Sequence, residues 1–539
     1  MKYKKILFLT VDALPQTWIE DNINLLGDDS SLSYLVNNGL SFNNAYSTGF
    51  PTQLAFPSIF SSVSPLDKHG YSDGIKYNKN KLAHILSKNG YKTIGISTTP
   101  TLSYSNGYAS GYDEFQDVYN IKKIVTIAKK IKYEHCKELY RCGQISEKKF
   151  IINNISILNN ILKDILYFCN KNILSIENHE FKKNIIFDQY NFSSIQGAII
   201  KLQKQINKEG YIININDIDN IYKDLVKIFR KSTRFKFKFY KLFYAIFRRF
   251  LSLFSSILHY KDINSIYPTA DYLSDIVLDK LNENKENNCF IWAHFMDVHE
   301  SMNHKHRWQI VPFWKNQIKS NWAVEVNSSV KYFDSQLKKI LNHLRSSNEL
   351  DKCLIILTSD HGLQRSNSKR MENKCLKSFY EEYIKVPIIF FGKDLRVKSE
   401  EIICSHLDLM PTLFDLLGIE NKFALNGSSL IDFKEKNRKD FFVEGLGGGD
   451  CDFSHKPIYL SIRYAQYRFF WIESSHYNKD KWILKDNWAK LGPHLYDLKN
   501  DKYQTNNLVN DIRLQDLVSF LENKCLNKCR KIRKAQINK

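Results

Sequence analysis

The stretch KILFLTVD, Lys5–Asp12, places a run of apolar residues directly before a carboxylate. An apolar run without polar alternation is typical of a strand that is covered on both faces, as in a parallel sheet. Similar runs recur in NCFIWAHFMD (288–297), KCLIILTSDHG (352–362) and VPIIFFG (386–392). We therefore predict that these four segments are strands of one sheet.

Segments with helical periodicity lie between the predicted strands. KLAHILSKNG (81–90) shows this period and ends on a glycine, and SSVKYFDSQLKKILNHLRSS (328–347) shows it over a longer stretch. Strands that alternate with helices predict a parallel sheet sandwiched between helices. In such a sheet the residues that follow the carboxyl ends of the strands meet at one edge, where functional groups are expected.

Two parts of the chain depart from this alternation. Residues 118–270 are rich in Lys, Ile and Asn and have helical patterns, whereas PIYLSIRYAQYRFFWIES (457–474) alternates as antiparallel strands do. We expect an α/β fold with a mostly parallel sheet, a helical insertion and a small C-terminal antiparallel subdomain. The predicted boundaries are 1–117 and 271–420 for the α/β catalytic domain, 118–270 for the basic insertion, 421–511 for the antiparallel subdomain and 512–539 for a basic, surface-exposed tail helix.

The chain is strongly basic, with 78 Lys and Arg against 57 Asp and Glu and a net charge of +21. This charge favours an anionic partner, but no nucleic-acid-binding motif accompanies it, so nucleic acid is not expected. The basic aromatic segment 234–260 has two interpretations: peripheral contact with the inner face of a membrane, or a helix packed on the main domain. The initial apolar run is too short for an export signal, so we expect a cytoplasmic protein.

Polar residues that follow three of the predicted strands are candidate metal ligands. FLTVD ends on Asp12, LTSDHG holds Asp360 beside His361, and HFMDVHES contains three further candidates. Carboxylates and imidazoles bind divalent cations, and Gly362 allows a close turn after the pair. Each motif alone also fits a polar loop or a helix cap, but their joint placement at strand ends favours one site. The candidates in HFMDVHES are His294, Asp297 and His299, of which His294 lies inside the strand and is expected to pack in the core.

The order of these motifs resembles the sulfatase branch of the alkaline phosphatase superfamily. The resemblance covers most of residues 1–118 and 275–510 and implies a metal-dependent enzyme acting on sulfate or phosphate esters. It is carried by FLTVD, AYSTGFPTQLAFPSIFSSVSPLDKHG, GYKTIGIS, GYASGYDEF, MDVHES, LTSDHG, VPIIFFG, SHLDLMPTLFDLLGI and LYDLKNDKYQTNNL.

Thr52 falls on the nucleophile position that the resemblance implies, counted back from Pro65 and His69-Gly70. Sulfatases carry Cys or Ser there and oxidise it to formylglycine, a route that threonine does not fit. Related phosphoethanolamine and glycerol-phosphate transferases use a threonine nucleophile instead. Thr48 and Ser47 are rival hydroxyls, and Thr52 alternatively serves only as a helix N-cap.

The resemblance also implies the remaining roles in the site. One divalent metal ion (Mn, Mg, Ca or Zn) is expected, and one ion is favoured because Ala13 stands where sulfatases carry a second aspartate. The expected substrate is an anionic ester of a polysaccharide or a lipid-linked glycan, and the alternative is a non-catalytic glycan- or membrane-binding protein on the same fold. The implied residues are Asp12, Thr52, Asp360 and His361 for the metal, Thr52 and His299 for catalysis, and His406 and Arg463 for substrate binding.

Overall fold

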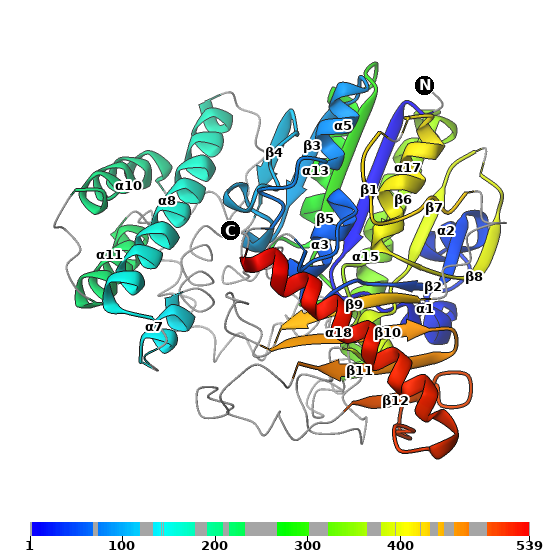
Figure 1. The fold of residues 1–539 in the computed structure, drawn as a ribbon. Helices are drawn as coiled ribbons and strands as arrows, with labels where there is room; N and C mark the ends of the chain where they lie inside the picture. The colour runs from blue at the N-terminus through cyan, green and yellow to red at the C-terminus, as the bar shows by residue number, and fades with distance from the viewer. Residues whose placement is uncertain are drawn as a thin grey trace, which may run out of the picture.

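Two sheets and the helices around them make up the protein in a computed structural model (Figure 1). The residues that the structure describes are 3–67, 74–118, 133–141, 143, 145–177, 191–208, 215–231, 267–300, 322–363, 379–393, 395–420, 422–431, 440–446, 457–473 and 493–537. The segment 234–260 and the pair His69-Gly70 lie outside these residues.

The larger sheet has the strand order β4-β3-β5-β1-β6-β7-β2-β8. Every pairing in it is parallel except those of β7, which runs antiparallel to β6 and β2. This confirms the predicted α/β class, and the VPIIFFG segment forms the one reversed strand of this sheet. The strands are β1 (Lys5–Val11), β2 (Leu40–Tyr46), β3 (Lys92–Ser97), β4 (Glu114–Asp117), β5 (Cys289–Phe295), β6 (Cys353–Thr358), β7 (Ile388–Phe391) and β8 (Lys398–Ser405).

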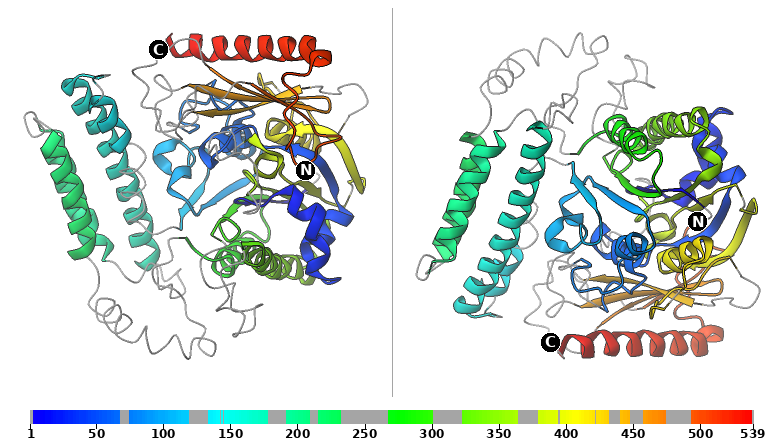
Figure 2. Two further views of the ribbon diagram at one scale, coloured as in Figure 1. Left: turned by 90° about the horizontal axis from the view of Figure 1, so that it is seen from below. Right: turned by 90° about the horizontal axis from the view of Figure 1, so that it is seen from above.

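Helices cover both faces of this sheet, which is why β1 is buried along its whole length (Figure 2). Alternate residues of β1 enter opposite cores: Leu7 and Leu9 pack with one set of helices, and Ile6 and Phe8 with the other. The first set contains α2 (Ser31–Asn38), α13 (Ala270–Glu283) and α15 (Trp322–Ser346); the second contains α3 (Thr52–Ser61), α5 (Leu82–Lys88) and α17 (Leu409–Leu417).

The insertion is helical in its described parts and lies beside the β3–β4 edge of the sheet (Figure 1). Its long helix α8 contacts the main domain: the Tyr104 and Tyr167 rings stack with centroids 4.7 Å apart, and Ser103 Oγ donates to Asp164 at 3.2 Å. No helix among the described residues has both the length and the apolar composition needed to cross a bilayer. The helices are α7 (Glu134–Arg141), α8 (Glu147–Glu177), α10 (Phe192–Ile206) and α11 (Ile215–Lys231).

The smaller sheet is antiparallel, as predicted, with the order β12-β11-β10-β9. Its strands are β9 (Asp440–Leu446), β10 (Ile458–Tyr464), β11 (Tyr467–Ile472) and β12 (His494–Asp497). The tail helix α18 (Gln515–Ile537) packs across β10 and β11 and buries Leu521 and Cys525 in a shared core. The tail is therefore helical but not fully exposed, because one of its faces completes the core of this subdomain.

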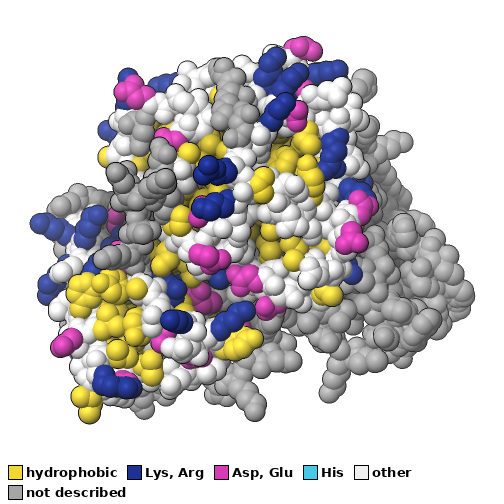
Figure 3. All heavy atoms as spheres, turned by 90° about the vertical axis from the view of Figure 1, so that its right-hand side faces the viewer, with side chains coloured by type: hydrophobic (Ala, Val, Ile, Leu, Met, Phe, Trp, Pro, Cys, Tyr) yellow, Lys and Arg dark blue, Asp and Glu magenta, His cyan; other side chains and the backbone are white. Residues whose placement is uncertain are grey.

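The described Lys and Arg residues do not form a single basic patch on the face shown in Figure 3. There, Lys and Arg side chains are dispersed among acidic and apolar ones. Net charge therefore identifies no binding surface among the described residues of this face.

Candidate metal centre and nucleophile

The carboxyl ends of β1 and β6 bring two aspartates together. The strands pair in parallel register up to Thr10 and Thr358, so Asp12 and Asp360 follow at the same edge of the sheet. The Ala13 N–H donates to Asp360 Oδ1 at 3.1 Å and joins the two turns. Ala13 has a φ of 62°, a left-handed conformation that a non-glycine residue adopts at some cost and that functional sites often retain.

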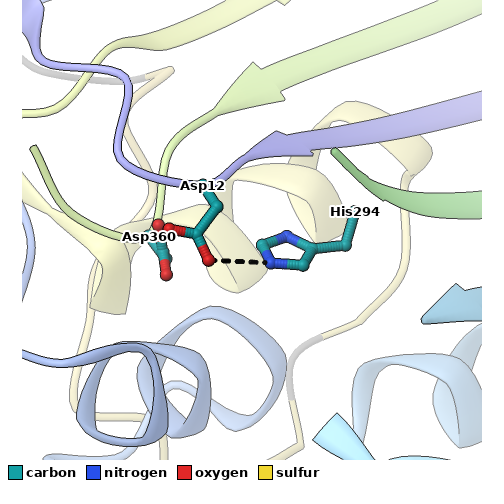
Figure 4. A group of neighbouring side chains, drawn as sticks. All are labelled: Asp12, His294 and Asp360. Carbon is teal, nitrogen blue, oxygen red and sulfur yellow. Dashed lines mark hydrogen bonds and ion pairs between the residues drawn. The ribbon is translucent and has the colours of Figure 1, made fainter. Parts of the chain in front are cut away.

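Asp12, Asp360 and His294 form a buried cluster, in which Asp12 lies between the other two side chains (Figure 4). One potential ligand atom from each residue lies within 4.8 Å of the others. Asp12 Oδ1 and Asp360 Oδ2 are buried without a hydrogen-bond partner among the described residues. Buried carboxylate oxygens without donors are costly, so this cluster is suited to a cation.

His361 presents an imidazole nitrogen to the same two carboxylates. Its Nδ1 lies 2.8 Å from the Gly362 carbonyl and must donate to it, so the neutral ring carries its lone pair on Nε2. Nε2 lies 3.7 Å from Asp12 Oδ1 and 3.5 Å from Asp360 Oδ2. The turn needs Gly362, because a Cβ there would collide with the Glu382 carbonyl. A ring fixed by a backbone carbonyl is the usual arrangement of a metal-binding histidine.

Thr52 is the first residue of α3, and its hydroxyl faces this cluster. Oγ1 lies 3.5 Å from both Asp12 Oδ2 and His361 Nε2. Pro51 precedes the helix as its N-cap, without a side-chain hydrogen bond. The rival hydroxyls are engaged elsewhere, since Thr48 Oγ1 donates to Ser58 Oγ and Ser47 Oγ donates to the Gly49 carbonyl. Of Ser47, Thr48 and Thr52, Thr52 is therefore the residue whose hydroxyl faces the cluster.

The residues fit a divalent cation. Among the described residues, two carboxylate oxygens without donors and His361 Nε2, the lone-pair nitrogen of the neutral ring, combine oxygen and nitrogen ligands that suit Mn, Mg, Ca or Zn. His361 Nε2 lies 3.7 Å from Asp12 Oδ1 and 3.5 Å from Asp360 Oδ2, close enough for the nitrogen to share an ion with either oxygen at about 2.0–2.2 Å from each atom. Asp12, Asp360 and His361, with the Thr52 hydroxyl beside them, are thus the residues that would hold it.

Opposing effects act on the pKa of Asp12. Burial raises it, but the charge of His299 and the hydrogen bond from His294 hold it well below its ordinary value. Asp12 is therefore an ionised carboxylate at neutral pH and can serve as a ligand.

His299 lies at the open side of the cluster. Its side chain is 42% exposed, and its ring centroid lies 6.4 Å from that of His361. The charge of Asp12 raises the pKa of His299 to about 9 against the opposing effect of burial, and Glu300 Oε1, 3.1 Å from Nδ1, adds to the rise. His299 is therefore protonated at neutral pH and accessible, as a proton donor to a substrate must be.

The three candidates in HFMDVHES separate in the structure. His294 is buried as expected from its place in β5, but its Nε2 also points at Asp12 Oδ2 at 3.3 Å, which its apolar neighbours did not indicate. Asp297 lies outside the cluster, because its Oδ1 accepts from the Ala270 N–H at the start of α13. No local pattern in the sequence separates His294 from Asp297, because β5 ends at Phe295 and Asp297 lies beyond it.

His406 and Arg463, the two residues predicted to bind substrate, lie in different places. His406 is fully buried, and its Nε2 donates to the carbonyl of Ser359, the residue before Asp360, at 2.8 Å. Burial lowers its pKa to about 3. Arg463 Nη1 donates to the Gln466 carbonyl, and its side chain lines a separate cavity of about 290 Å³ beside Tyr46 and Glu381. These positions give His406 a supporting place in the site and leave Arg463 outside the cluster.

The fold and the carboxylate–imidazole cluster define an α/β protein of the sulfatase and alkaline phosphatase superfamily. The sequence model of the Sulfatase family matches residues 4–167 and 171–419, so the chain belongs to this family, whose members are sulfuric and phosphoric ester hydrolases.

Characterised relatives are similar to part of the chain. A Delta 4,5-hexuronate-2-O-sulfatase of Bacteroides thetaiotaomicron is 26% identical over 38% of this chain and 40% of its own length. The multifunctional alkaline phosphatase superfamily protein PehA of Trinickia caryophylli is 26% identical over 36% of this chain and 37% of its own length. The matched segment thus spans less than half of these relatives.

Solved structures resemble the whole fold. A 2-O GAG sulfatase superposes with a TM-score of 0.56 at 13% identity, covering 100% of this chain and 94% of its own. The phosphonate monoester hydrolase of Agrobacterium radiobacter superposes with a TM-score of 0.53 at 14% identity, covering 98% and 96%. At these identities the likeness establishes the fold alone.

Proposed function

We propose that this protein is a metal-dependent hydrolase or transferase of sulfate or phosphate esters in which Thr52 is the covalent nucleophile. The observation that carries the proposal is the position of Thr52 Oγ1, 3.5 Å from Asp12 Oδ2 and from His361 Nε2 at the start of α3. Family membership supports the reaction class. The absence of Cys or Ser at this position in the sequence argues against a formylglycine.

The first half of the reaction transfers the ester group to Thr52. Oγ1 attacks the sulfur or phosphorus atom, a new bond to Oγ1 forms, and the bond to the leaving alcohol oxygen breaks. The Thr52 proton moves toward Asp12 Oδ2, which faces the hydroxyl. A bound divalent cation would lower the pKa of the hydroxyl and neutralise the anionic ester oxygens.

His299 handles the proton of the leaving group. Its exposed ring lies 6.4 Å from the His361 ring beside the cluster, and in its protonated form it gives a proton to the departing alcohol oxygen. In the second half, His299 takes a proton from water or an acceptor alcohol, which attacks the same sulfur or phosphorus atom. The bond to Thr52 Oγ1 then breaks, and Thr52 regains its proton.

The substrate that we propose is an anionic ester carried by a glycan. Support comes from relatives and structural neighbours whose names refer to a hexuronate 2-O-sulfate and to GAG sulfates. The phosphonate monoester hydrolase among the structural neighbours keeps phosphorus esters in the same proposal. The two ester classes differ in the central atom, so a substrate panel separates them.

A panel of p-nitrophenyl esters tests the proposal. Sulfate, phosphate, phosphodiester and phosphonate substrates are assayed with Mn²⁺, Mg²⁺, Ca²⁺ or Zn²⁺, and again after chelation. We expect turnover of at least one ester class that requires the cation and is lost in Thr52→Ala. Thr48→Val is the matched control, because it removes a neighbouring hydroxyl that bonds to Ser58 instead of facing the cluster.

The outcomes separate the alternatives. Turnover that survives in Thr52→Ala contradicts the nucleophile, and turnover that survives chelation contradicts the metal. A folded wild-type protein that binds no cation and hydrolyses no ester supports the non-catalytic binding protein instead. A product formed only when glycerol or another acceptor alcohol is added identifies a transferase.

A further inference from the structure

A chain of buried hydrogen bonds runs from the middle of the sheet to Asp12. The Trp292 Nε1–H donates to Thr10 Oγ1 at 3.0 Å, and Thr10 Oγ1 lies 2.9 Å from His294 Nδ1. His294 Nε2 in turn lies 3.3 Å from Asp12 Oδ2. β1 and β5 place these groups side by side, because Thr10 pairs with His294 in the register of the sheet.

With a neutral His294, the hydrogen bonds of this chain have one consistent set of donors and acceptors. The Asp12 carboxylate can only accept, so Nε2 of a neutral His294 carries the hydrogen and Nδ1 accepts. The Thr10 hydroxyl then donates to Nδ1, and its oxygen accepts from Trp292. The other acceptor near the hydroxyl, the Ala293 carbonyl, is more distant at 3.4 Å. Every donor in the chain therefore points toward Asp12.

Packing holds the imidazole in this orientation. The Phe56 ring meets the His294 ring edge to face with centroids 5.1 Å apart, and the Trp292 ring stacks on it at 6.3 Å. The side chains of all three are buried, and the Thr98 hydroxyl donates to the His294 carbonyl at 2.7 Å. The His294 ring packs against Phe56 and Trp292, and both of its nitrogens are within hydrogen-bond distance of a partner. In this orientation it therefore directs Nε2–H at Asp12 and offers no lone pair to a cation beside Asp12 and Asp360.

The two oxygens of Asp12 consequently differ. Oδ2 is held by His294 and faced by Thr52, whereas Oδ1 has no hydrogen-bond partner among the described residues and points toward His361 Nε2. We infer that His294 is a positioning residue, outside the set of metal ligands, which holds Asp12 Oδ2 through the Trp292–Thr10–His294 chain and thereby presents Oδ1 to the cation. This inference rests on the proposed metal site.

Metal titration of the full-length protein tests it. Mn²⁺, Mg²⁺, Ca²⁺ and Zn²⁺ are each titrated into the metal-free wild type and into His294→Ala, His294→Gln and Thr10→Val by calorimetry. Loss of an outer hydrogen-bond partner typically weakens metal binding about 10- to 100-fold, and we expect this for His294→Ala. We expect His294→Gln to recover most of the affinity, because its amide N–H can replace Nε2–H, and Thr10→Val to fall between them.

Thr93→Val is the matched control. It removes another buried threonine hydroxyl with several hydrogen bonds, but at the amino end of β3, away from the cluster. Its metal affinity should equal that of the wild type. Thermal unfolding of each variant verifies that the proteins compared are folded.

Pulsed electron paramagnetic resonance of bound Mn²⁺ gives an independent measurement by counting coordinated imidazole nitrogens. We expect one in the wild type, unchanged in His294→Ala. Two nitrogens, or equal metal affinity in His294→Ala and the wild type, would overturn the inference while leaving the metal site intact. A wild type that binds none of the four cations would overturn the proposed function as well.

Discussion

Replacing Asp360 with Asn should stabilise the metal-free protein while abolishing metal binding. The Asn Oδ1 can still accept from the Ala13 and His361 N–H groups, which Asp360 Oδ1 does now at 3.1 and 2.8 Å. The Asn Nδ2 would replace Oδ2, which has no donor among the described residues and lies 3.5 Å from His361 Nε2. The substitution thus removes a negative charge and places an N–H donor next to the lone pair of His361 Nε2.

The magnitude follows from the separation of the carboxylates. The potential ligand atoms of Asp12 and Asp360 lie within 4.8 Å of each other, and two unit charges at that distance repel by about 3.5 kcal/mol at an effective dielectric constant of about 20. The positive charge of nearby His299 offsets part of this repulsion. We expect a gain in the free energy of unfolding of about 1–3 kcal/mol, visible as a rise of a few degrees in Tm.

Adding the cation should make the wild type more stable than Asp360→Asn. A cation at about 100 times its Kd stabilises the wild type by about 2.7 kcal/mol, whereas Asp360→Asn should gain nothing. Thermal unfolding with chelator and with Mn²⁺ measures both effects. Asp275→Asn, on the exposed side of α13, controls for the change in net charge. A metal-free Asp360→Asn protein that melts below the wild type would refute the argument that these carboxylates repel each other without an ion.

Three further substitutions test other parts of the structure. His299→Gln should slow hydrolysis of alkyl esters about 10²- to 10⁴-fold and p-nitrophenyl esters far less, because nitrophenolate leaves without a proton; equal losses would contradict a general acid. Burial lowers the pKa of His406 to about 3 in the folded protein, against about 6.5 in the unfolded chain. Because the unfolded chain therefore binds a proton first, the free energy of unfolding falls as pH drops below 6.5. Relative to His406→Gln, urea denaturation of the wild type should show a loss of about 1.4 kcal/mol per pH unit between pH 6 and 4. Glu444 is buried and forms an ion pair with Lys528 at 2.8 Å, so Lys528→Met leaves a buried carboxylate without its partner. We expect urea unfolding to show a loss of roughly 3 kcal/mol in stability, most of which the additional substitution Glu444→Gln should restore.

The predicted elements of the large sheet could be found from local patterns. A strand covered on both faces has apolar residues at most positions, so KILFLTVD and CLIILT are visible in the sequence as strands. The direction of a strand cannot be predicted from its apolar residues. β7 is as apolar as the parallel strand β6, and only its pairing with β6 and β2 shows that it is antiparallel.

The residues of the site could be predicted from the sequence, but their convergence could not. Asp12, Asp360 and His361 could be proposed because they directly follow predicted strands, and the spacing to Pro65 selected Thr52 from several hydroxyls. Their convergence follows from parallel pairing, which brings the carboxyl ends of β1 and β6 to one edge.

The sequence by itself determined the alternation of strands and helices and the residue types at the strand ends, because both depend on neighbours along the chain. Only the tertiary structure decided which side chains face one another. It turned His294 toward Asp12 and Asp297 toward α13, and it laid α18 across the small sheet. Such contacts join residues far apart in the chain, and their geometry depends on register and packing that no local pattern specifies.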